Sequence, residues 1–460
     1  MLALLAFAIL LYALSLHGFA GDLLMDIANG RWIIAHAYVP LHNMLTQARA
    51  GAPWANDEWL FGVYVAWLYA HLGVQGVLLG LAPVLAITAL MMALMASRLR
   101  SPFDLAAIAL FAFAMHITMS PRPQLFSYLF FAFDLWAVLE HRRGRRWPLW
   151  LAVSLVPLWA NLHSSALLMP LLTLSVVVFG SPAARERREL LLAAAIGLVL
   201  FFAHPGGPAM GTGFLAQILT PGIVDHIIEW MSVSLFSPEG WPLLLVLPLG
   251  GWLGWRAARR GDLVLASWVI LGIAMTGFAV RFVPYTVLCV LAVASLDPAL
   301  TARFTHKNTR RVMAAALAVG TLLALASLWS RPAFVVREPI TAITWLKSHR
   351  ANDVLAFYSF GDALDFYGLR PFVDGRAELW TRQQWWPPYL DAQFGQVSPA
   401  SFASKYDPSA RYILWPALPS VVQDMKKNRS WRLVYRDTAD EARTALFQIG
   451  PVDVWEKTTP

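Results

Sequence analysis

The sequence that decides the fold is FAGDLLMDIANGRWIIAHAYVPLHNMLTQARAGAPWANDEW, residues 19–59, the longest polar stretch before the C-terminal tail. The preceding residues, 1–19, have no Asp, Glu, Lys or Arg and are numerous enough to cross the roughly 30 Å hydrocarbon core of a bilayer as a helix. Asp22 and Asp26 therefore emerge where the chain leaves the membrane, and a spacing of four residues puts both on one helix face. Carboxylates are costly beside a bilayer and are kept there mainly for function, so the stretch predicts a functional site.

Composition indicates a polytopic membrane protein, because 58% of the residues are hydrophobic, only 14% are charged and 21 are Trp. The formal net charge of +8 does not indicate a nucleic-acid-binding patch, since the excess of Lys and Arg lies in loops between apolar runs. The single cysteine, Cys289, excludes an intrachain disulfide framework.

Apolar runs predict an α-helical polytopic membrane protein with about 11 transmembrane helices. The expected spans are 1–19, 75–97, 103–119, 124–140, 147–160, 164–180, 189–203, 240–255, 263–280, 282–297 and 312–330. A further apolar run, Trp59 to Gly73, is interpreted as an interfacial helix, because only then do the basic loops fall on one side of the membrane.

In this arrangement Lys and Arg are distributed very unevenly between the two sides. One side has 16 of them: Arg98, Arg100, Arg142, Arg143, Arg145, Arg146, Arg185, Arg187, Arg188, Arg256, Arg259, Arg260, Arg303, Lys307, Arg310 and Arg311. The other side has four: Arg31, Arg49, Arg122 and Arg281. The positive-inside rule then predicts a cytoplasmic N-terminus and a C-terminal tail on the outer side.

The same arrangement places several short polar clusters on the outer side, where they are candidates for binding a substrate. Their candidate residues are Arg122, Gln124, Asn161, His163, His204, Glu229 and Arg281. Each also has a structural alternative: prolines break a hairpin, an arginine extends to lipid phosphate, and a histidine caps a helix end. Asp57 and Glu58, at the end of the opening stretch, complete the set of outer acids.

Beyond Trp329 the pattern changes to a small α/β domain. Strands are predicted at 354–360, 371–373, 412–415, 431–435 and 445–449, and helices at 339–349, 378–386 and 419–427. Asp362 and Asp374 follow two of these strands, at the edge where α/β sheets usually bind ligands. Turn formation alone is the alternative.

The stretch from Gly30 to Pro40 resembles the first outer loop of GT-C glycosyltransferases, and the likeness continues through Asn56 to Leu60. Further motifs resemble a group of mostly uncharacterised bacterial membrane proteins: Asp22, Gly30-Arg31, Glu58-Trp-Leu60, Pro121 to Gln124, Trp159 to His163, and Asp374-Gly-Arg-Ala-Glu378. The group commonly has acids two apart at the start of this loop, whereas here the earlier position is Ala20. The resemblance implies an enzyme that takes a sugar from a polyprenyl-phosphate donor on the outer face of the bacterial inner (plasma) membrane.

The chemistry of the residues agrees with this resemblance. A carboxylate at the membrane surface suits the general base that takes the acceptor proton, a role assigned to Asp22 and Asp26. Arg122 and Arg281 suit the donor phosphate, because a guanidinium binds phosphate in a bidentate manner. No cofactor is required by any motif, and clustered acids make Mg²⁺ or Mn²⁺ possible.

The predicted organisation is a GT-C-like transmembrane domain at 1–335, with its first outer loop at 20–74, and a periplasmic α/β domain at 336–460. The expected partners are the lipid-linked donor, an unidentified glycan, lipid or protein acceptor, and the bilayer. A non-catalytic transport or assembly protein on the same scaffold is the alternative function.

Overall fold

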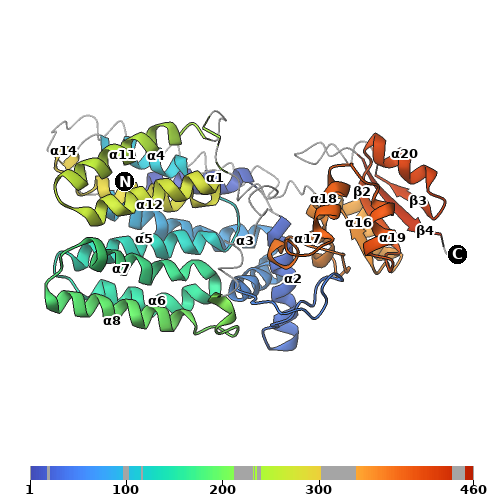
Figure 1. The fold of residues 1–460 in the computed structure, drawn as a ribbon, viewed down its shortest axis with the longest axis horizontal. Helices are drawn as coiled ribbons and strands as arrows, with labels where there is room; N and C mark the ends of the chain where they lie inside the picture. The colour runs from blue at the N-terminus through green and yellow to red at the C-terminus, as the bar shows by residue number, and fades with distance from the viewer. Residues whose placement is uncertain are drawn as a thin grey trace. The chain divides into compact units, whose positions relative to one another are not determined.

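The structure, a computed structural model, describes residues 2–17, 21–96, 103–115, 118–211, 232, 234–235, 240–301, 338–437 and 451–458. Contacts divide them into two compact units (Figure 1). The helical unit contains 2–17, 74–210 and the described residues from 232 to 301, and the loop-and-sheet unit contains 21–73 together with 338–458. Each unit is described by itself.

The helical unit is a bundle of apolar helices. They are α1 (Leu2–His17), the second part of α3 (Trp59–Ala96), α4 (Phe103–Ala114), α5 (Gln124–His141), α6 (Trp147–Leu162), α7 (Leu168–Phe179), α8 (Ala184–Phe201), α11 (Leu243–Arg259), α12 (Leu263–Phe278), α13 (Val283–Ala294) and the short α14 (Pro298–Thr301). Successive helices pack against one another, α5 on α6, α7 on α8, and α12 on both α11 and α13. Short connections favour this antiparallel packing of neighbours.

Helices occupy every predicted span except 312–330, which lies outside the described residues. Within the part of the chain that the structure describes, Trp59–Ala96 is the one helix long and apolar enough to cross a membrane, and others are apolar helices of 10–17 residues. The number of eleven spans therefore stays a prediction. Gly73, with φ 64° and ψ −160°, interrupts α3 and separates the run 59–73 from the helix that begins at Val74.

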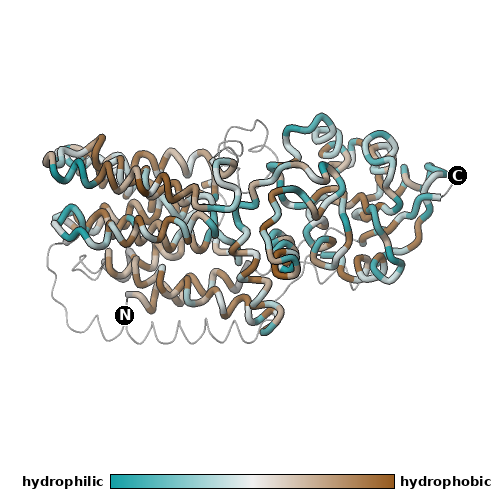
Figure 2. Tube along the Cα trace, turned by 90° about the horizontal axis from the view of Figure 1, so that it is seen from below, coloured by the Kyte–Doolittle hydropathy of each residue, from teal (hydrophilic) through white to brown (hydrophobic). Residues whose placement is uncertain are grey.

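Three of the predicted basic loops, at 142–146, 185–188 and 256–260, meet at one end of the helical unit. Arg142 after α5 pairs with Asp262 before α12 at 2.8 Å. Arg146 pairs with Glu189 of α8 at 3.2 Å, and Arg256 of α11 pairs with Asp297 at 3.0 Å. The hydropathy view shows hydrophilic residues at the ends of these helices and apolar residues along them (Figure 2).

The loop-and-sheet unit has a four-stranded mixed sheet of order β1-β2-β4-β3. The strands are β1 (Val354–Ala356), β2 (Tyr412–Pro416), β3 (Trp431–Arg436) and β4 (Val452–Lys457). β1 runs parallel to β2, and β4 is antiparallel to both β2 and β3. The helices of this unit are α2 (Gly21–His36), the first part of α3, α16 (Ile340–Ser348), α17 (Gly361–Phe366), α18 (Trp386–Gln393), α19 (Pro399–Tyr406) and α20 (Pro419–Lys427).

The first loop joins the C-terminal part through a shared core and backbone hydrogen bonds. Ala48 and Trp54 of the loop pack with Trp380, Tyr389 and other core residues of the C-terminal part. The backbone N–H groups of Gln47 and Ala48 donate to the carbonyl oxygens of Pro371 and Phe372, at 2.9 and 3.0 Å. The predicted first outer loop, 20–74, was assigned from the sequence to the transmembrane domain. Its described residues 21–73 belong by contacts to the same compact unit as the C-terminal residues, whereas Val74 belongs to the helical unit.

The predicted α/β pattern is correct for three strands and two helices and wrong at two places. Residues 371–373 form only an isolated bridge, Val354 to Pro371, beside β1. Residues 378–386 form a 3₁₀ turn, Ala377–Leu379, and the helix starts only at Trp386, because Pro387 and Pro388 suit a first helical turn and not its interior. β4 was not predicted, and the expected strand 445–449 lies outside the described residues.

Candidate functional site

The site in the loop-and-sheet unit begins with α2, which carries Asp22 in its first turn. α2 packs closely on the first part of α3, because a Cβ at Gly30 would lie 2.0 Å from the carbonyl oxygen of Gly62. α2 also packs against α17, which follows β1 (Figure 1). Asp22 is thereby held beside the C-terminal part of the same unit.

The second side of the site is formed where two neighbouring segments leave the sheet. Segment 371–373 runs alongside β1, with the N–H of Phe372 donating to the carbonyl of Val354 at 2.9 Å. The two segments are parallel, so the residues that follow them meet at one edge. Asp362 follows β1 and Asp374-Gly375 follows 371–373, as the strand-end pattern predicts.

Two carboxylates converge over Gly375. The position that a Cβ of Gly375 would occupy lies 2.8 Å from Asp362 Oδ2 and 3.1 Å from Asp22 Oδ1. The backbone N–H of Gly375 also donates to Asp362 Oδ1 at 2.7 Å. A side chain at Gly375 would displace both acids, so glycine is required here for the approach of the two carboxylates.

The environment of Asp362 favours its protonated form. Asp362 is buried, and burial, followed by the negative charges of Asp22 and Asp374, raises its pKa well above the usual range. The hydroxyl of Tyr358 donates to the carbonyl of Gly375 at 3.0 Å, and its pKa is likewise raised by burial and by Asp362 and Asp22. A protonated Asp362 facing Asp22 can donate a hydrogen bond to it.

Arg376 supplies the positive charge next to these acids. Its Nε donates to Asp374 Oδ2 at 2.8 Å, and its Nη2 donates to Asn43 Oδ1 at 2.8 Å. The guanidinium lies 4.4 Å from the ring centroid of Trp54. Asn43 and Trp54 come from the first loop, so Arg376 links the loop to the Asp374–Glu378 turn.

Glu378 titrates in the range useful for proton transfer. Burial, followed by the charge of Asp57, raises the pKa of Glu378 to about 7. A carboxyl group with such a pKa is partly ionised at neutral pH and can both accept and donate a proton. The charge of Asp57 in the first loop thus raises the pKa of Glu378 in the turn Asp374–Glu378, and the two acids belong to one group.

The remaining first-loop acids take different positions. Asp26 is 2% exposed, and its backbone carbonyl lies against Gly62 of α3. Glu58 immediately precedes α3, and its carbonyl accepts from the N–H of Gly62 at 3.0 Å. Asp22 is the first-loop acid that acts on Asp362.

The other predicted site residues gather in the helical unit, at the helix ends opposite the basic loops. His163 Nδ1 accepts from the N–H of Ser165 at 3.1 Å and caps the start of the turn Ser164–Leu167. Asn161 Nδ2 donates to the carbonyl oxygens of Pro157 and Ala203, at 2.7 and 2.8 Å.

His204, Arg122 and Arg281 lie at the same end of the helical unit. His204 Nδ1 accepts from the N–H of Gly206 at 2.9 Å, which stabilises the turn. Arg281 acts electrostatically on Tyr128, His163 and Tyr285, and Arg122 acts on Tyr128. The two arginines therefore share one region, where Gln124 begins α5. Glu229 lies outside the described residues.

No three His, Cys, Asp or Glu side chains in the described ranges are placed to hold a metal ion together. Asp22 and Asp362 lie over Gly375, and Asp374 is engaged by Arg376. The Mg²⁺ or Mn²⁺ that the sequence makes possible stays a prediction, and no step of the proposed chemistry uses a metal.

Sequence reasoning missed the roles of Asp362, Gly375 and Glu378. The sequence did contain signals for these residues, because Asp362 and Asp374 were placed at strand ends and Asp374 to Glu378 was quoted as a motif. What it lacked was the contact of this motif with the first loop, 320 residues and more away in the chain.

Comparisons with known proteins give a fold and no family. No family model and no curated protein matches the chain. The solved archaeal oligosaccharyltransferase AglB from Archaeoglobus fulgidus, in complex with an inhibitory peptide and a dolichol-phosphate, is 11% identical, with a TM-score of 0.56 over 90% of this chain and 69% of its own. The same enzyme tethered with an acceptor peptide containing the NVT sequon is 12% identical, with a TM-score of 0.52 over 90% and 68% of the chains.

The apo form of the Archaeoglobus fulgidus oligosaccharyltransferase gives a TM-score of 0.55 at 10% identity. At such identities the likeness shows the fold alone, and it agrees with the GT-C-like fold expected from the first loop. Membership of the bacterial group stays a prediction.

Proposed function

We propose that this chain is a membrane glycosyltransferase that moves a sugar from a polyprenyl-phosphate-linked donor to an acceptor, with Asp22 as the base. The observation that carries the proposal is the convergence of Asp22 and Asp362 over Gly375. It is supported by the oligosaccharyltransferase fold, whose solved example binds a dolichol-phosphate.

The proposed chemistry needs a base with a neighbour that sets its protonation. Asp22 takes the proton of the acceptor hydroxyl or amide as the acceptor attacks the sugar carbon, and the bond from that carbon to the phosphate oxygen breaks. Asp362, whose pKa is raised by burial and by the charge of Asp22, holds its own proton and orients the carboxylate of Asp22. The phosphate leaves with the lipid.

The leaving phosphate requires cations, a role that we propose for Arg122 and Arg281. Replacing either by lysine keeps the charge but removes the planar pair of donors. We expect each variant to bind undecaprenyl phosphate about tenfold more weakly, since charge-assisted bidentate pairs contribute roughly 1.5–3 kcal/mol. Native mass spectrometry of the detergent-purified protein measures the bound fraction.

The control for this experiment is Arg142→Lys, at the opposite end of the helical unit, which pairs with Asp262. Its lipid binding is expected to equal that of the parent. Unchanged binding in both Arg122→Lys and Arg281→Lys would assign these arginines to lipid headgroups in general, and a parent protein that binds no undecaprenyl phosphate would contradict the proposed donor.

We further propose an inner-membrane location with a cytoplasmic N-terminus and the acids on the periplasmic side. The uneven distribution of Lys and Arg supports this orientation. Single cysteines are placed at Arg143 and at Asp391 in a Cys289→Ser background. In intact cells only the cysteine at Asp391 is expected to react with a maleimide that cannot cross the inner membrane, and the cysteine at Arg143 is expected to react once the membrane is opened. Labelling of both from outside, or of neither, would contradict it.

A further inference from the structure

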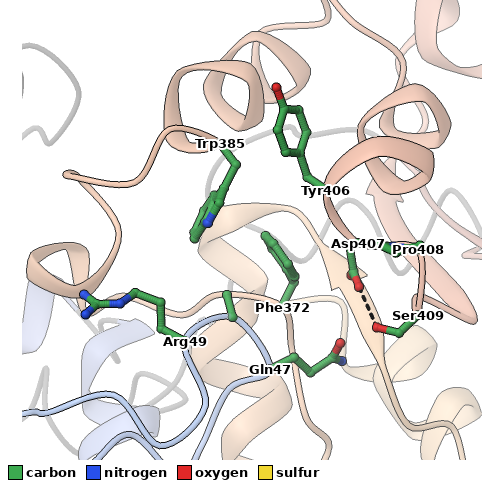
Figure 3. A pocket seen from close by; sticks show the side chains of 9 residues that line it. Gln47, Arg49, Phe372, Trp385, Tyr406, Asp407, Pro408 and Ser409 are labelled. Atoms are coloured by element: carbon green, nitrogen blue, oxygen red, sulfur yellow. Dashed lines mark hydrogen bonds between the residues drawn. The ribbon is translucent and has the colours of Figure 1, made fainter.

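A cavity in the loop-and-sheet unit is lined by residues other than the acids over Gly375. It has a volume of about 280 Å³, and its lining combines first-loop residues 47–49 with Phe372, Trp385 and the segment 406–409 (Figure 3). Pockets for drug-sized molecules measure roughly 300–1,000 Å³, so this cavity suits one small ring or group.

Aromatic rings form one side of the cavity. Phe372 and Trp385 meet edge to face with their centroids 5.0 Å apart, which fixes the indole. Phe372 is buried, whereas Trp385 and Tyr406 are only partly buried. The cavity therefore offers fixed aromatic surface to a ligand.

Two hydrogen-bond acceptors on the other side lack donors among the described residues. Asp407 is 3% exposed; its Oδ1 accepts from the hydroxyl of Ser409 at 2.9 Å, and its buried Oδ2 has no partner. Gln47 donates through Nε2 to the carbonyl of Arg370, while its buried Oε1 has no partner. A buried acceptor without a donor is costly, so both favour a ligand that donates.

Hydrogen bonds within the protein hold the walls of the cavity. Backbone hydrogen bonds join Gln47 and Ala48 to the segment 371–372. Arg49 Nη1 donates to the carbonyl of Leu379 at 3.0 Å, which fixes the loop from its other side. Little ordering is therefore needed on binding, which favours even a small ligand.

We infer that this cavity binds one neutral sugar ring. A pyranose has an apolar face of C–H groups that packs on Trp385 and Tyr406, and a rim of hydroxyls that donate to Asp407 Oδ2 and Gln47 Oε1. Asp407 disfavours an anionic ligand, and Arg49 disfavours a cationic one, so a neutral donor-rich ligand fits both. That the ring belongs to a glycan used in transfer rests on the proposed function.

The test is saturation-transfer NMR of the full-length, detergent-purified protein with methyl glycosides of glucose, galactose, mannose and N-acetylglucosamine. We expect saturation of the ring protons of at least one glycoside. Trp385→Ala and Asp407→Asn are each expected to weaken binding at least about fivefold, because they remove the stacking surface and the charged acceptor. Two matched controls in the same unit, Phe394→Ala and Asp424→Asn, change exposed residues outside the cavity and should leave binding unchanged.

Circular dichroism and thermal unfolding show whether each variant folds, and Asp407→Asn, which keeps the volume of the side chain, carries the test if Trp385→Ala does not fold. Three results would each overturn the inference. They are absence of saturation with all four glycosides, binding in both cavity variants that equals binding by the parent protein, and binding of methylammonium in place of the glycosides. Because the readout is binding, a protein that binds a glycoside but transfers no sugar would overturn the proposed function alone, and one that transfers sugar but binds no glycoside would overturn the cavity assignment alone.

Discussion

Replacing Asp22 by asparagine is expected to lower sugar transfer by about 10²- to 10⁴-fold, the usual contribution of a general base. Asparagine keeps the size of the side chain but cannot accept the acceptor's proton. Binding of the lipid donor, measured separately, is expected to stay within about twofold, because the proposed phosphate ligands are Arg122 and Arg281. Radiolabelled or mass-resolved product per unit time, with detergent-purified protein and saturating donor, gives the rate.

A merely structural role for Asp22 has a different signature. Asp22 lies in the first turn of α2, where an acid interacts with the helix dipole by about 0.3–1 kcal/mol. Asp22→Asn would then lower thermal stability slightly and leave the rate per folded molecule unchanged. Asp424→Asn, at an exposed position of α20, is the control for the substitution itself.

Two neighbouring substitutions separate the base from the residues that position it. Asp362→Asn keeps an N–H donor toward Asp22, so its loss should be at least about tenfold smaller than that of Asp22→Asn. Gly375→Ala places a methyl group 2.8 Å from Asp362 Oδ2 and 3.1 Å from Asp22 Oδ1. Because this methyl group would displace both carboxylates, Gly375→Ala should also reduce the rate of transfer, as Asp22→Asn does. If Asp26→Asn abolished transfer while Asp22→Asn did not, the base would be Asp26, one helical turn along. Transfer at the rate of the parent in both variants would contradict the assignment of the base to this helix.

The helical framework could be predicted because its signals are local. A span is predicted from a run of about 20 apolar residues, a signal that lies within the run itself. For example, α5 begins at Gln124 and ends at His141, close to the predicted 124–140. The end-to-end separation of basic loops from polar clusters also follows from local charge. The ion pair of Arg142 with Asp262 and the hydrogen bond of Asn161 to Ala203 join the loops that were expected to share a side.

The acid site could be predicted only in part because its geometry depends on distant contacts. Asp22 and Asp57 were selected from the cost of acids at a membrane surface, and that argument cannot say what they face. Their neighbours, Asp362 and Glu378, are brought to them by α2 packing on α17 and by Arg376 binding Asn43. Neither contact follows from a periodic pattern in the sequence. The position of the acids at strand ends therefore predicted a site at this edge of the sheet but not which first-loop residues lie there.

Replacing Arg376 by methionine is expected to lower the free energy of unfolding of the loop-and-sheet unit by about 3–5 kcal/mol, the usual cost of removing one partner of a buried ion pair. Arg376 and Asp374 are 3% and 0% exposed, so Asp374 would be left as a buried charge without its counter-ion. The loss also removes the hydrogen bond to Asn43 and the contact with Trp54, which hold the first loop. Thermal or urea unfolding monitored by tryptophan fluorescence measures the change.

A matched control comes from an exposed pair in the same unit. Arg432 pairs with Glu456 at 2.7 Å, but their side chains are 68% and 33% exposed, so Arg432→Met should cost less than about 1 kcal/mol. The double variant Arg376→Met with Asp374→Leu removes both buried charges and should recover part of the loss. Equal small effects of Arg376→Met and Arg432→Met would show that the buried pair contributes no more than a surface pair.

The pH dependence of the Arg376→Met variant has a defined sign. Asp362 and Asp365 have folded-state pKa values raised above the unfolded ones, chiefly by burial. The charges of Asp22 and Asp374 raise the pKa of Asp362 further, and the charge of Asp374 raises that of Asp365. Such groups stabilise the fold below their unfolded pKa, and this contribution is lost as pH rises through the folded pKa. The charge of Arg376 lowers the pKa of Asp365, so removing this cation raises that pKa further. The loss of unfolding free energy in the variant, relative to the parent, should therefore be smaller at pH 5 than at pH 8. A loss that grows as the pH falls would show that Arg376 does not act by neutralising these acids.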